Sequence, residues 1–258
     1  MTSAGRPLRL MCLLGVVVGA MADDLLDRFA ARVHAAADGG TLPYRWIQPE
    51  VAAGKRMPLV ILLHGTSGRG TDNGRQFTAA NRAAIAFLLA RADHPCAIAV
   101  PQCPADDQWT RTTYDPARHE RTPEPGRTMR TLLDLVRTLG GEPAIDARRI
   151  YVIGNSMGGY GTWDLLGRDP TLIAAAIPVC GGAALETAEA IARIPVWAFH
   201  GAMDGIVAPG HSQRMVAALR QHGGEARLTE FADAGHDIAD RVFTTPGLAD
   251  WLFTKERH

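Results

Sequence analysis

The stretch Ile150–Gly159 constrains the fold of this chain more than any other. It begins with the apolar, β-branched run Ile150–Ile153, which leads directly into Gly154-Asn155-Ser156-Met157-Gly158. A helix-compatible segment follows. A strand, a turn and a helix in this order predict a sharp turn whose central residue, Ser156, stands at the tip of the strand. Gly154 and Gly158 carry no side chains that would collide across such a turn.

The rest of the chain alternates between expected strands and expected helices. Pro58–Leu63 is continuously apolar, which is typical of a strand buried on both faces of a parallel sheet. Further strands are expected at 42–47, 96–101, 172–180, 195–199 and 226–231, and helices at 23–37, 76–90, 127–139, 183–192, 210–221 and 248–253. This alternation predicts an α/β fold with a mostly parallel sheet and helices on both faces. We expect residues 23–258 to form one domain without a cap, because the segment between 180 and 195 is short.

The N-terminus has the three-part pattern of a secretory signal peptide. Arg6 and Arg9 precede the apolar run 10–19, and small residues lie around a cleavage point at 20–22. The apolar run is shorter than the roughly 20 residues that span a bilayer. We therefore expect residues 1–22 to be cleaved, to leave no stable membrane span, and to direct the protein to the periplasm or the medium. An uncleaved N-terminal helix is the alternative.

The charge balance narrows the class of partner. Lys plus Arg and Asp plus Glu each number 27, so the formal net charge is zero. A balanced chain offers no excess positive charge for binding nucleic acid. A small neutral or mixed substrate therefore fits better than a polyanion, and no oligomeric state is indicated.

Three cysteines remain after the signal: Cys96, Cys103 and Cys180. Cys96 and Cys103 flank one expected strand, which holds them too far apart for a disulfide. There is no Cys-x-x-Cys pair, so a metal site built on thiolates is not expected. Cys96 and Cys180 are interpreted as small buried hydrophobic residues. Cys103, at a strand end, is a candidate lining residue of a site.

Residues that follow later strands could activate Ser156 as a nucleophile. A serine hydroxyl is a poor nucleophile at neutral pH unless a base takes its proton and a carboxylate orients that base. Asp204 follows the expected strand at 195–199, and His236 follows the one at 226–231. Sites in parallel sheets gather at the carboxyl ends of the strands, so Ser156, Asp204 and His236 are predicted to form a catalytic triad. Taken singly, Asp204 also fits a turn residue and His236 a solvated loop residue.

Other titratable residues nearby are weaker candidates. Asp233 and Asp237 are too close to His236 in sequence to come from a separate strand end. His200 and His64 each precede a glycine and are expected to shape their turns, His64 by holding the glycine-rich loop behind it. That loop lacks the Gly-Lys-Ser/Thr ending of a phosphate-binding loop, so phosphate binding is not expected.

Two backbone N–H groups, those of Met157 and Thr66, are predicted to form an oxyanion hole. Met157 directly follows the serine, and Thr66 follows the strand at 58–63. Trp109, Tyr114 and Cys103 are candidate walls of the substrate site, with core packing as the alternative for each. No metal-ligating set is predicted.

Several blocks carry a resemblance to a known family. They are Leu63-His64-Gly65, Gly68-Arg69-Gly70-Thr71-Asp72-Asn73, Pro101-Gln102-Cys103-Pro104, Trp109, Asp146 to Tyr151, Gly154 to Trp163, His200-Gly201 with Asp204, Gly235-His236 and Asp250-Trp251-Leu252-Phe253. Over residues 42 to 255 the chain resembles the α/β-hydrolase superfamily. More narrowly, it resembles secreted bacterial esterases of the phospholipase/carboxylesterase and predicted-peptidase type, which are related to prolyl-oligopeptidase and polyhydroxybutyrate depolymerase catalytic domains. Ile238 departs from the aromatic residue expected there, which bears on the shape of the acyl pocket.

The resemblance implies hydrolysis of carboxylic esters without a metal or an organic cofactor. The absence of a cap suggests an open cleft for short-chain, aryl or polymer-linked esters. A serine peptidase of the prolyl-oligopeptidase type is the alternative enzyme. A non-catalytic ligand-binding member of the fold is the alternative from another class.

Overall fold

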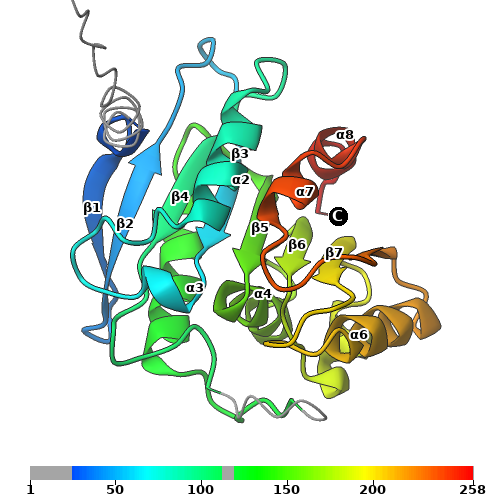
Figure 1. The fold of residues 1–258 in the computed structure, drawn as a ribbon. Helices are drawn as coiled ribbons and strands as arrows, with labels where there is room; N and C mark the ends of the chain where they lie inside the picture. The colour runs from blue at the N-terminus through cyan, green and yellow to red at the C-terminus, as the bar shows by residue number, and fades with distance from the viewer. Residues whose placement is uncertain (1–24, 112–118, 258) are drawn as a thin grey trace, which may run out of the picture.

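The computed structural model describes residues 25–111 and 119–257, and one eight-stranded sheet runs through them (Figure 1). The strands are β1 (Ala30–Ala35), β2 (Thr41–Ile47), β3 (Met57–Leu63), β4 (Ala97–Pro101), β5 (Ile145–Asn155), β6 (Ala175–Val179), β7 (Val196–Gly201) and β8 (Ala226–Phe231). Their order across the sheet is β1-β2-β4-β3-β5-β6-β7-β8. β2 pairs antiparallel with both β1 and β4, and the pairs from β4 to β8 are parallel.

Helices cover both faces of this sheet. They are α2 (Ala79–Leu89), α3 (Arg127–Gly140), α4 (Met157–Arg168), α5 (Ala188–Ile191), α6 (Gly210–Gln221), α7 (Ala239–Phe243) and α8 (Leu248–Phe253), with the short 3₁₀ turns η1 (Thr66–Gly68) and η2 (Leu185–Thr187). Apolar residues of α3, α4, α5 and α6 form one core cluster with Leu59 and Ile61 of β3. Residues of α2, α7 and α8 form the other with Val60 and Leu62. β3 therefore alternates between two cores, as a strand inside a covered parallel sheet must.

The expected helix at 23–37 is wrong. Residues 25–27 are helical, but Ala30–Ala35 is the edge strand β1, paired with β2 in register from Ala30 opposite Trp46 to Ala35 opposite Thr41. The glycines expected to end a helix instead form the hairpin turn, with Gly39 at φ 83°. Pairing with β2 overrides the helical preference of this alanine-rich segment, because propensity is a weak signal beside tertiary context.

The other expected elements are present, with shifted ends. The helix expected at 183–192 is divided into η2 and α5, and α7 was not expected. The signal peptide at 1–22 and Tyr114 lie outside the described residues. Within the described ranges, no helix is long and apolar enough to cross a membrane.

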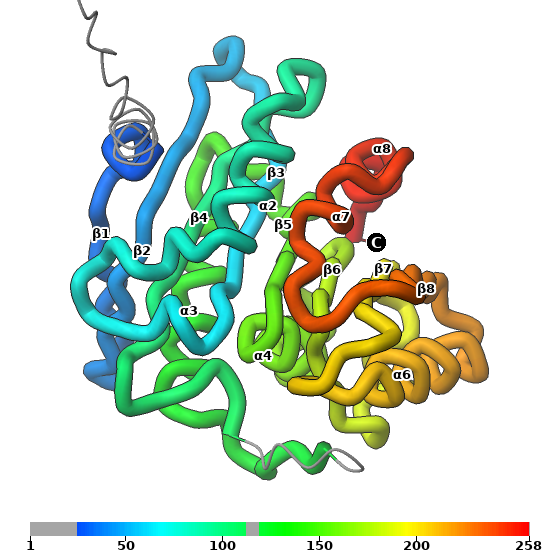
Figure 2. Tube along the Cα trace, in the orientation of Figure 1, coloured from blue at the N-terminus to red at the C-terminus, as the bar shows by residue number. Residues whose placement is uncertain are grey.

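The loops at the carboxyl ends of the strands converge near the start of α4. Figure 2 traces the chain from β5 into α4 and shows the segment between β8 and α7, in orange, looping toward that point. Gly201, at the end of β7, packs so closely on this segment that an added Cβ would overlap the carbonyl oxygen of Gly235. The end of β7 and the segment that follows β8 are therefore held against one another.

Candidate active site

Ser156 stands on the strained turn that the sequence predicts. It lies between β5 and α4 with φ 57° and ψ −118°, in the left-handed half of backbone space that non-glycine residues rarely adopt. A Cβ on Gly154 would overlap the carbonyl oxygen of Gly158, and a Cβ on Gly158 would overlap that of Leu63. Only glycine at both positions allows the turn to close this tightly and present the serine hydroxyl beyond the sheet.

A continuous chain of hydrogen bonds links Ser156 to a histidine and an aspartate from other strand ends. His236 Nε2 lies 2.8 Å from Ser156 Oγ. His236 Nδ1 lies 2.7 Å from Asp204 Oδ2. Asp204 follows β7 and His236 follows β8, so three separate strands supply the three side chains. We call them the serine–histidine–aspartate array.

The environment of Asp204 fixes the proton positions in this array. Its other oxygen, Oδ1, accepts hydrogen bonds from the backbone N–H groups of Ile206 (2.8 Å) and Val207 (2.9 Å). Burial alone would raise the pKa of this carboxyl, but the hydrogen bonds from Val207, His236 and Ile206 outweigh burial and hold it below its usual value. A carboxylate at Oδ2 requires a proton on His236 Nδ1, which leaves Nε2 free to accept the proton of Ser156.

The loop after β3 lies directly against Ser156. A Cβ on Gly65 would sit 3.4 Å from the Cβ of Ser156. Thr66 is the next residue, exposed at the start of η1, and Met157 is the first residue of α4. N–H groups in the first turn of a helix lack partners inside that helix, so both backbones bring possible donors to the same serine.

His64 holds this loop, as the sequence indicates. Its ring is fully buried, with Nδ1 2.6 Å from the carbonyl oxygen of Gly65, and its Nε2 accepts the backbone N–H of Cys103 at 3.0 Å. Burial lowers the pKa of His64 to about 4, against a weaker opposing effect from the Gly65 carbonyl. The ring is therefore neutral at pH 7, with its proton on Nδ1.

Gln102 ties the same loop to β4, a role that the sequence alone did not reveal. Gln102 Nε2 donates to Asp72 Oδ1 at 2.7 Å, and the backbone N–H of Asn73 donates to Gln102 Oε1 at 2.6 Å. Asn73 also donates to the carbonyl oxygen of Tyr44 at 3.2 Å and adopts φ 51°. The blocks Gly68–Asn73 and Pro101–Pro104 both belong to the family resemblance, and their joint presence is the one signal that could have indicated this contact.

Trp109 and Cys103, two of the candidate walls, lie in the core. Both are 0% exposed, so neither presents a surface to a ligand. Trp109 Nε1 donates to the carbonyl oxygen of His64 at 2.9 Å, and its side chain packs so closely on α4 that a Cβ on Gly161 would lie 2.5 Å from the Cβ of Trp109. Both residues are therefore part of the core, which was the alternative interpretation. Each supports the loop after β3 through a hydrogen bond to His64.

A cavity of about 450 Å³ lies on the same edge of the sheet. Its lining follows β4, β6 and β7 and consists of His119, Glu120, Arg121, Ala183, Leu185, Glu186, His211 and Arg214. Side chains of both charges occur in it, so the wall favours no single sign of charge. Sequence reasoning did not identify these residues, because they are scattered over three separate segments, including η2 and the first turns of α6, without a common motif.

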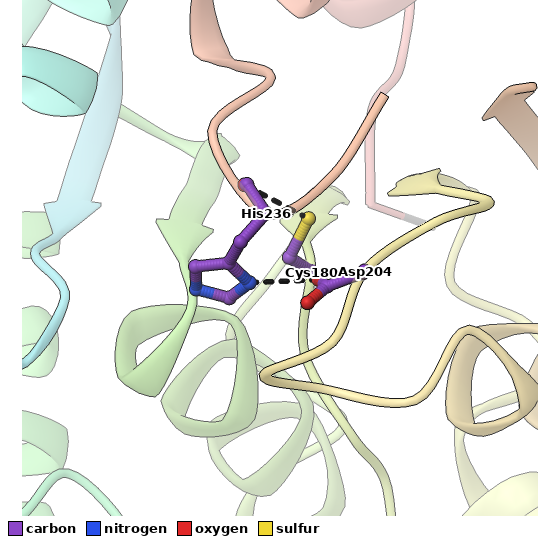
Figure 3. Close-up of side chains that lie close together, drawn as sticks. All are labelled: Cys180, Asp204 and His236. Atoms are coloured by element: carbon purple, nitrogen blue, oxygen red, sulfur yellow. Dashed lines mark hydrogen bonds and ion pairs between the residues drawn. The ribbon is translucent and has the colours of Figure 1, made fainter. Parts of the chain in front are cut away.

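Cys180 adds a thiol to the array, as Figure 3 shows. Ligand atoms of Cys180, Asp204 and His236 lie within 4.8 Å of one another, a combination that can bind a soft metal ion. The surroundings favour hydrogen bonding instead. Burial raises the pKa of the Cys180 thiol, which keeps it protonated, and its Sγ donates to the carbonyl oxygen of His236 at 3.5 Å. Cys96, Cys103 and Cys180 are all free and buried.

Comparison with known proteins identifies the family. The model of the phospholipase/carboxylesterase family matches residues 48–245. The chain belongs to this family. Its structure is similar to the crystal structure of a thermostable esterase, with 34% sequence identity and a TM-score of 0.81 over 90% of this chain. This phospholipase/carboxylesterase family member spans 64% of the length of that esterase.

More distant structures share the α/β-hydrolase fold. Est1E from Butyrivibrio proteoclasticus is 15% identical, with a TM-score of 0.61 over 87% of this chain and 98% of Est1E. The acylaminoacyl peptidase of Pyrococcus horikoshii is 17% identical, with a TM-score of 0.62 over 86% of this chain and 40% of the peptidase. No curated protein sequence matches the chain. The chain is thus a hydrolase-family member with the α/β-hydrolase fold.

Proposed function

We propose that this protein is a serine carboxylesterase that works through an acyl-enzyme. One observation carries the proposal: the unbroken array from Ser156 Oγ through His236 to the Asp204 carboxylate, at 2.8 Å and 2.7 Å. A serine on a strained turn, hydrogen-bonded to a correctly oriented imidazole, is what acyl transfer requires. Membership of the phospholipase/carboxylesterase family supports the same chemistry.

The reaction begins when Ser156 Oγ attacks the ester carbonyl and His236 Nε2 takes its proton. Asp204 stabilises the imidazolium that forms. The N–H groups of Met157 and Thr66 bind the negative charge on the former carbonyl oxygen. His236 then protonates the departing alkoxide, which leaves as the alcohol. Water, deprotonated by the same imidazole, releases the acid from the serine.

The test is a panel of p-nitrophenyl and hydroxycinnamoyl esters of varied acyl length, run on wild type and Ser156→Ala. We expect wild type to hydrolyse short-chain or aryl esters and to be labelled by a fluorophosphonate probe. Ser156→Ala should lose the label and several orders of magnitude in kcat. Near wild-type hydrolysis by Ser156→Ala would show that another residue is the nucleophile.

A peptidase is the second candidate, because acylaminoacyl peptidases share the fold. The same array would attack a peptide amide, which needs stronger protonation of the leaving nitrogen. Turnover of blocked peptide amides at rates that exceed ester turnover would favour this function. A non-catalytic binding protein is the third candidate, and failure of the fluorophosphonate to label Ser156 would favour it.

We also propose that the protein acts outside the cytoplasm after removal of residues 1–22. The basic, apolar and small-residue regions of this segment support the proposal. Intact mass measurement of the protein recovered from the periplasm or medium tests it. A mature chain that begins near Asp23 is expected, and a full-length chain confined to the cytoplasm would refute it.

A further inference from the structure

His200 is a second histidine in contact with the aspartate of the array. It lies in β7, four residues before Asp204, and its ring is 0% exposed. His200 Nε2 is 3.3 Å from Asp204 Oδ2, the same oxygen that faces His236. Nε2 is also 3.0 Å from the carbonyl oxygen of Val207, in the turn whose N–H groups hold Asp204 Oδ1. His200 thus faces both the carboxylate and the turn that carries it.

The other ring nitrogen determines the tautomer. His200 Nδ1 lies 2.7 Å from Ser212 Oγ in α6. Both neighbours of Nε2 are acceptors, a carbonyl oxygen and a carboxylate, so Nε2 must carry the proton. Nδ1 is therefore an acceptor, and the Ser212 hydroxyl donates to it at 2.7 Å, with the carbonyl oxygen of Gly181 as a longer second acceptor at 3.3 Å. Burial lowers the pKa of His200, in line with a neutral ring, although the Val207 carbonyl opposes this effect.

We propose that His200 is a positioning residue that holds Asp204 in the orientation His236 needs, with Ser212 fixing the tautomer of His200. The inference rests on the proposed function of the array. It extends the array beyond the carboxylate: Ser212, His200, Asp204, His236 and Ser156 form one series of polar contacts, in which His200 Nε2 donates to the Val207 carbonyl and lies 3.3 Å from Asp204 Oδ2. His200 shapes the turn, as the sequence predicts, and also contacts the carboxylate itself.

Contacts from several elements show why this position matters for the carboxylate. Asp204 Oδ2 must receive the N–H of His236 in the plane of that ring, and rotation of the carboxyl group would break this bond. The N–H groups of Ile206 and Val207 hold Oδ1, and His200 Nε2, which donates to the carbonyl oxygen of Val207, lies 3.3 Å from Oδ2. Without His200, the turn loses the hydrogen bond at Val207 and Oδ2 loses a polar neighbour in a buried place, so the carboxyl group gains freedom to turn.

The charged and titratable groups that face His200 are few. Asp204 and His236 approach from the two loops, and Glu230 pairs with it across the β7–β8 ladder. The thiol of Cys180 lies within 4.8 Å of Asp204 and His236, and burial keeps it uncharged. Among the described residues that surround Asp204, His236 and His200 thus bring ring nitrogens to Oδ2, at 2.7 Å and 3.3 Å.

The experiment compares two amide substitutions. In His200→Gln the side-chain NH₂ reaches the place of Nε2 and can still donate toward Asp204 and Val207. In His200→Asn the amide reaches only as far as Nδ1, toward Ser212, and the donor to the Val207 carbonyl beside Asp204 is lost. We expect His200→Gln to keep kcat within about three-fold of wild type and His200→Asn to lose about ten- to a hundred-fold, the effect of leaving a buried acceptor without its donor.

The pH profile separates positioning from loss of folded protein. Activity is normalised to sites titrated with fluorophosphonate. For His200→Asn we expect KM to stay within about two-fold of wild type and the midpoint of the acid limb of kcat/KM to move by at least about half a pH unit. A purely structural role would lower the titrated fraction and leave the limb in place. Ser212→Ala should give a smaller loss in the same direction.

Trp197→Phe is the matched control, because it removes a hydrogen bond of 2.9 Å from the same strand to Thr229 without touching the array. We expect its normalised kcat and acid limb to equal those of wild type. Equal normalised activity and equal acid limbs in His200→Asn, His200→Gln and wild type would overturn the inference. Activity in Ser156→Ala, measured in the same series, would instead overturn the proposed function on which it rests.

Discussion

Replacing Asp204 by Asn tests the proton positions in the array. The two oxygens of the Asp204 carboxylate have different hydrogen-bond partners, and Asn keeps only one of them as an oxygen. Oδ1 accepts two backbone N–H groups, at 2.8 Å and 2.9 Å, and an amide NH₂ there would oppose two donors. The oxygen of Asn must therefore take the Oδ1 place, and its NH₂ must face His236 Nδ1. Nδ1 then has to accept a hydrogen bond, so the ring proton moves to Nε2, which faces Ser156.

An imidazole with its proton on Nε2 cannot take the proton of Ser156. The expected loss in kcat is about 10⁴-fold, the size of effect known for an aspartate-to-asparagine change that produces the wrong tautomer in a serine protease triad. This corresponds to about 5 kcal/mol of transition-state stabilisation. KM should change little, because the side chain is buried behind His236 and does not face substrate.

The assay is hydrolysis of a p-nitrophenyl ester, with folding checked by thermal melting. Asp233→Asn and Asp237→Asn serve as controls, since they remove the same charge on either side of His236. Asp233 pairs with Arg241 at 2.7 Å and Asp237 is exposed to solvent, so both controls should keep activity within about two-fold. If folded Asp204→Asn keeps more than a tenth of wild-type kcat, the tautomer argument is wrong.

Three further predictions concern the supports of the serine turn. The pKa of His64 is about 4 in the folded protein against about 6.5 for a solvent-exposed histidine, so its stabilising contribution is complete above pH 6.5 and is lost as pH falls from 6.5 through 4. Urea unfolding should show that the free energy of unfolding falls by about 2–3 kcal/mol between pH 7.5 and 4.5 because of His64, and that it falls less in His64→Gln. Equal dependence of this free energy on pH in the two proteins would contradict the neutral, buried state of His64. Gly158→Ala should lower stability by about 1–3 kcal/mol through overlap with the carbonyl oxygen of Leu63, seen as a lower melting temperature and weaker fluorophosphonate labelling. Trp109→Phe removes the 2.9 Å hydrogen bond to His64, so it should lower the free energy of unfolding by about 1 kcal/mol and also slow ester hydrolysis. The control Trp251→Phe loses a 2.9 Å hydrogen bond to Glu225 and should lower stability without changing the rate of hydrolysis.

The sheet was predictable wherever burial left a clear pattern. β3 is apolar at every position because both of its faces are covered, and β4 and β6 are short apolar runs for the same reason. β1 gave no such signal, since it is an edge strand with five of its six residues exposed. Its alanines and spaced apolar residues satisfy a helical pattern equally well. Its strand conformation depends on pairing with β2, and the residue pattern within Ala30–Ala35 contains no information about that pairing.

The candidate site was predictable for a different reason. The turn at Ser156 demands glycine at fixed spacing, and that demand is visible in the sequence. Asp204 and His236 lie together with Ser156 because each follows a strand of the same parallel sheet, and their part in catalysis remains a prediction. The residues that support the loop after β3 could not be predicted in this way. Gln102 and Trp109 contact segments far away in the chain, and the spacing of residues in the sequence does not indicate such contacts.

His200 shows where spacing alone reaches its limit. Its sequence context, a strand end before glycine, correctly indicates a residue that shapes a turn. Only the distances of 3.3 Å to Asp204 and 2.7 Å to Ser212 show that the turn it shapes is the one holding the carboxylate. A buried histidine between a hydroxyl donor and two acceptors has a single workable tautomer. The same hydrogen-bonding logic that aligns His236 with Ser156 therefore continues through Asp204 into the core, and the acid of the array is as tightly oriented as its base.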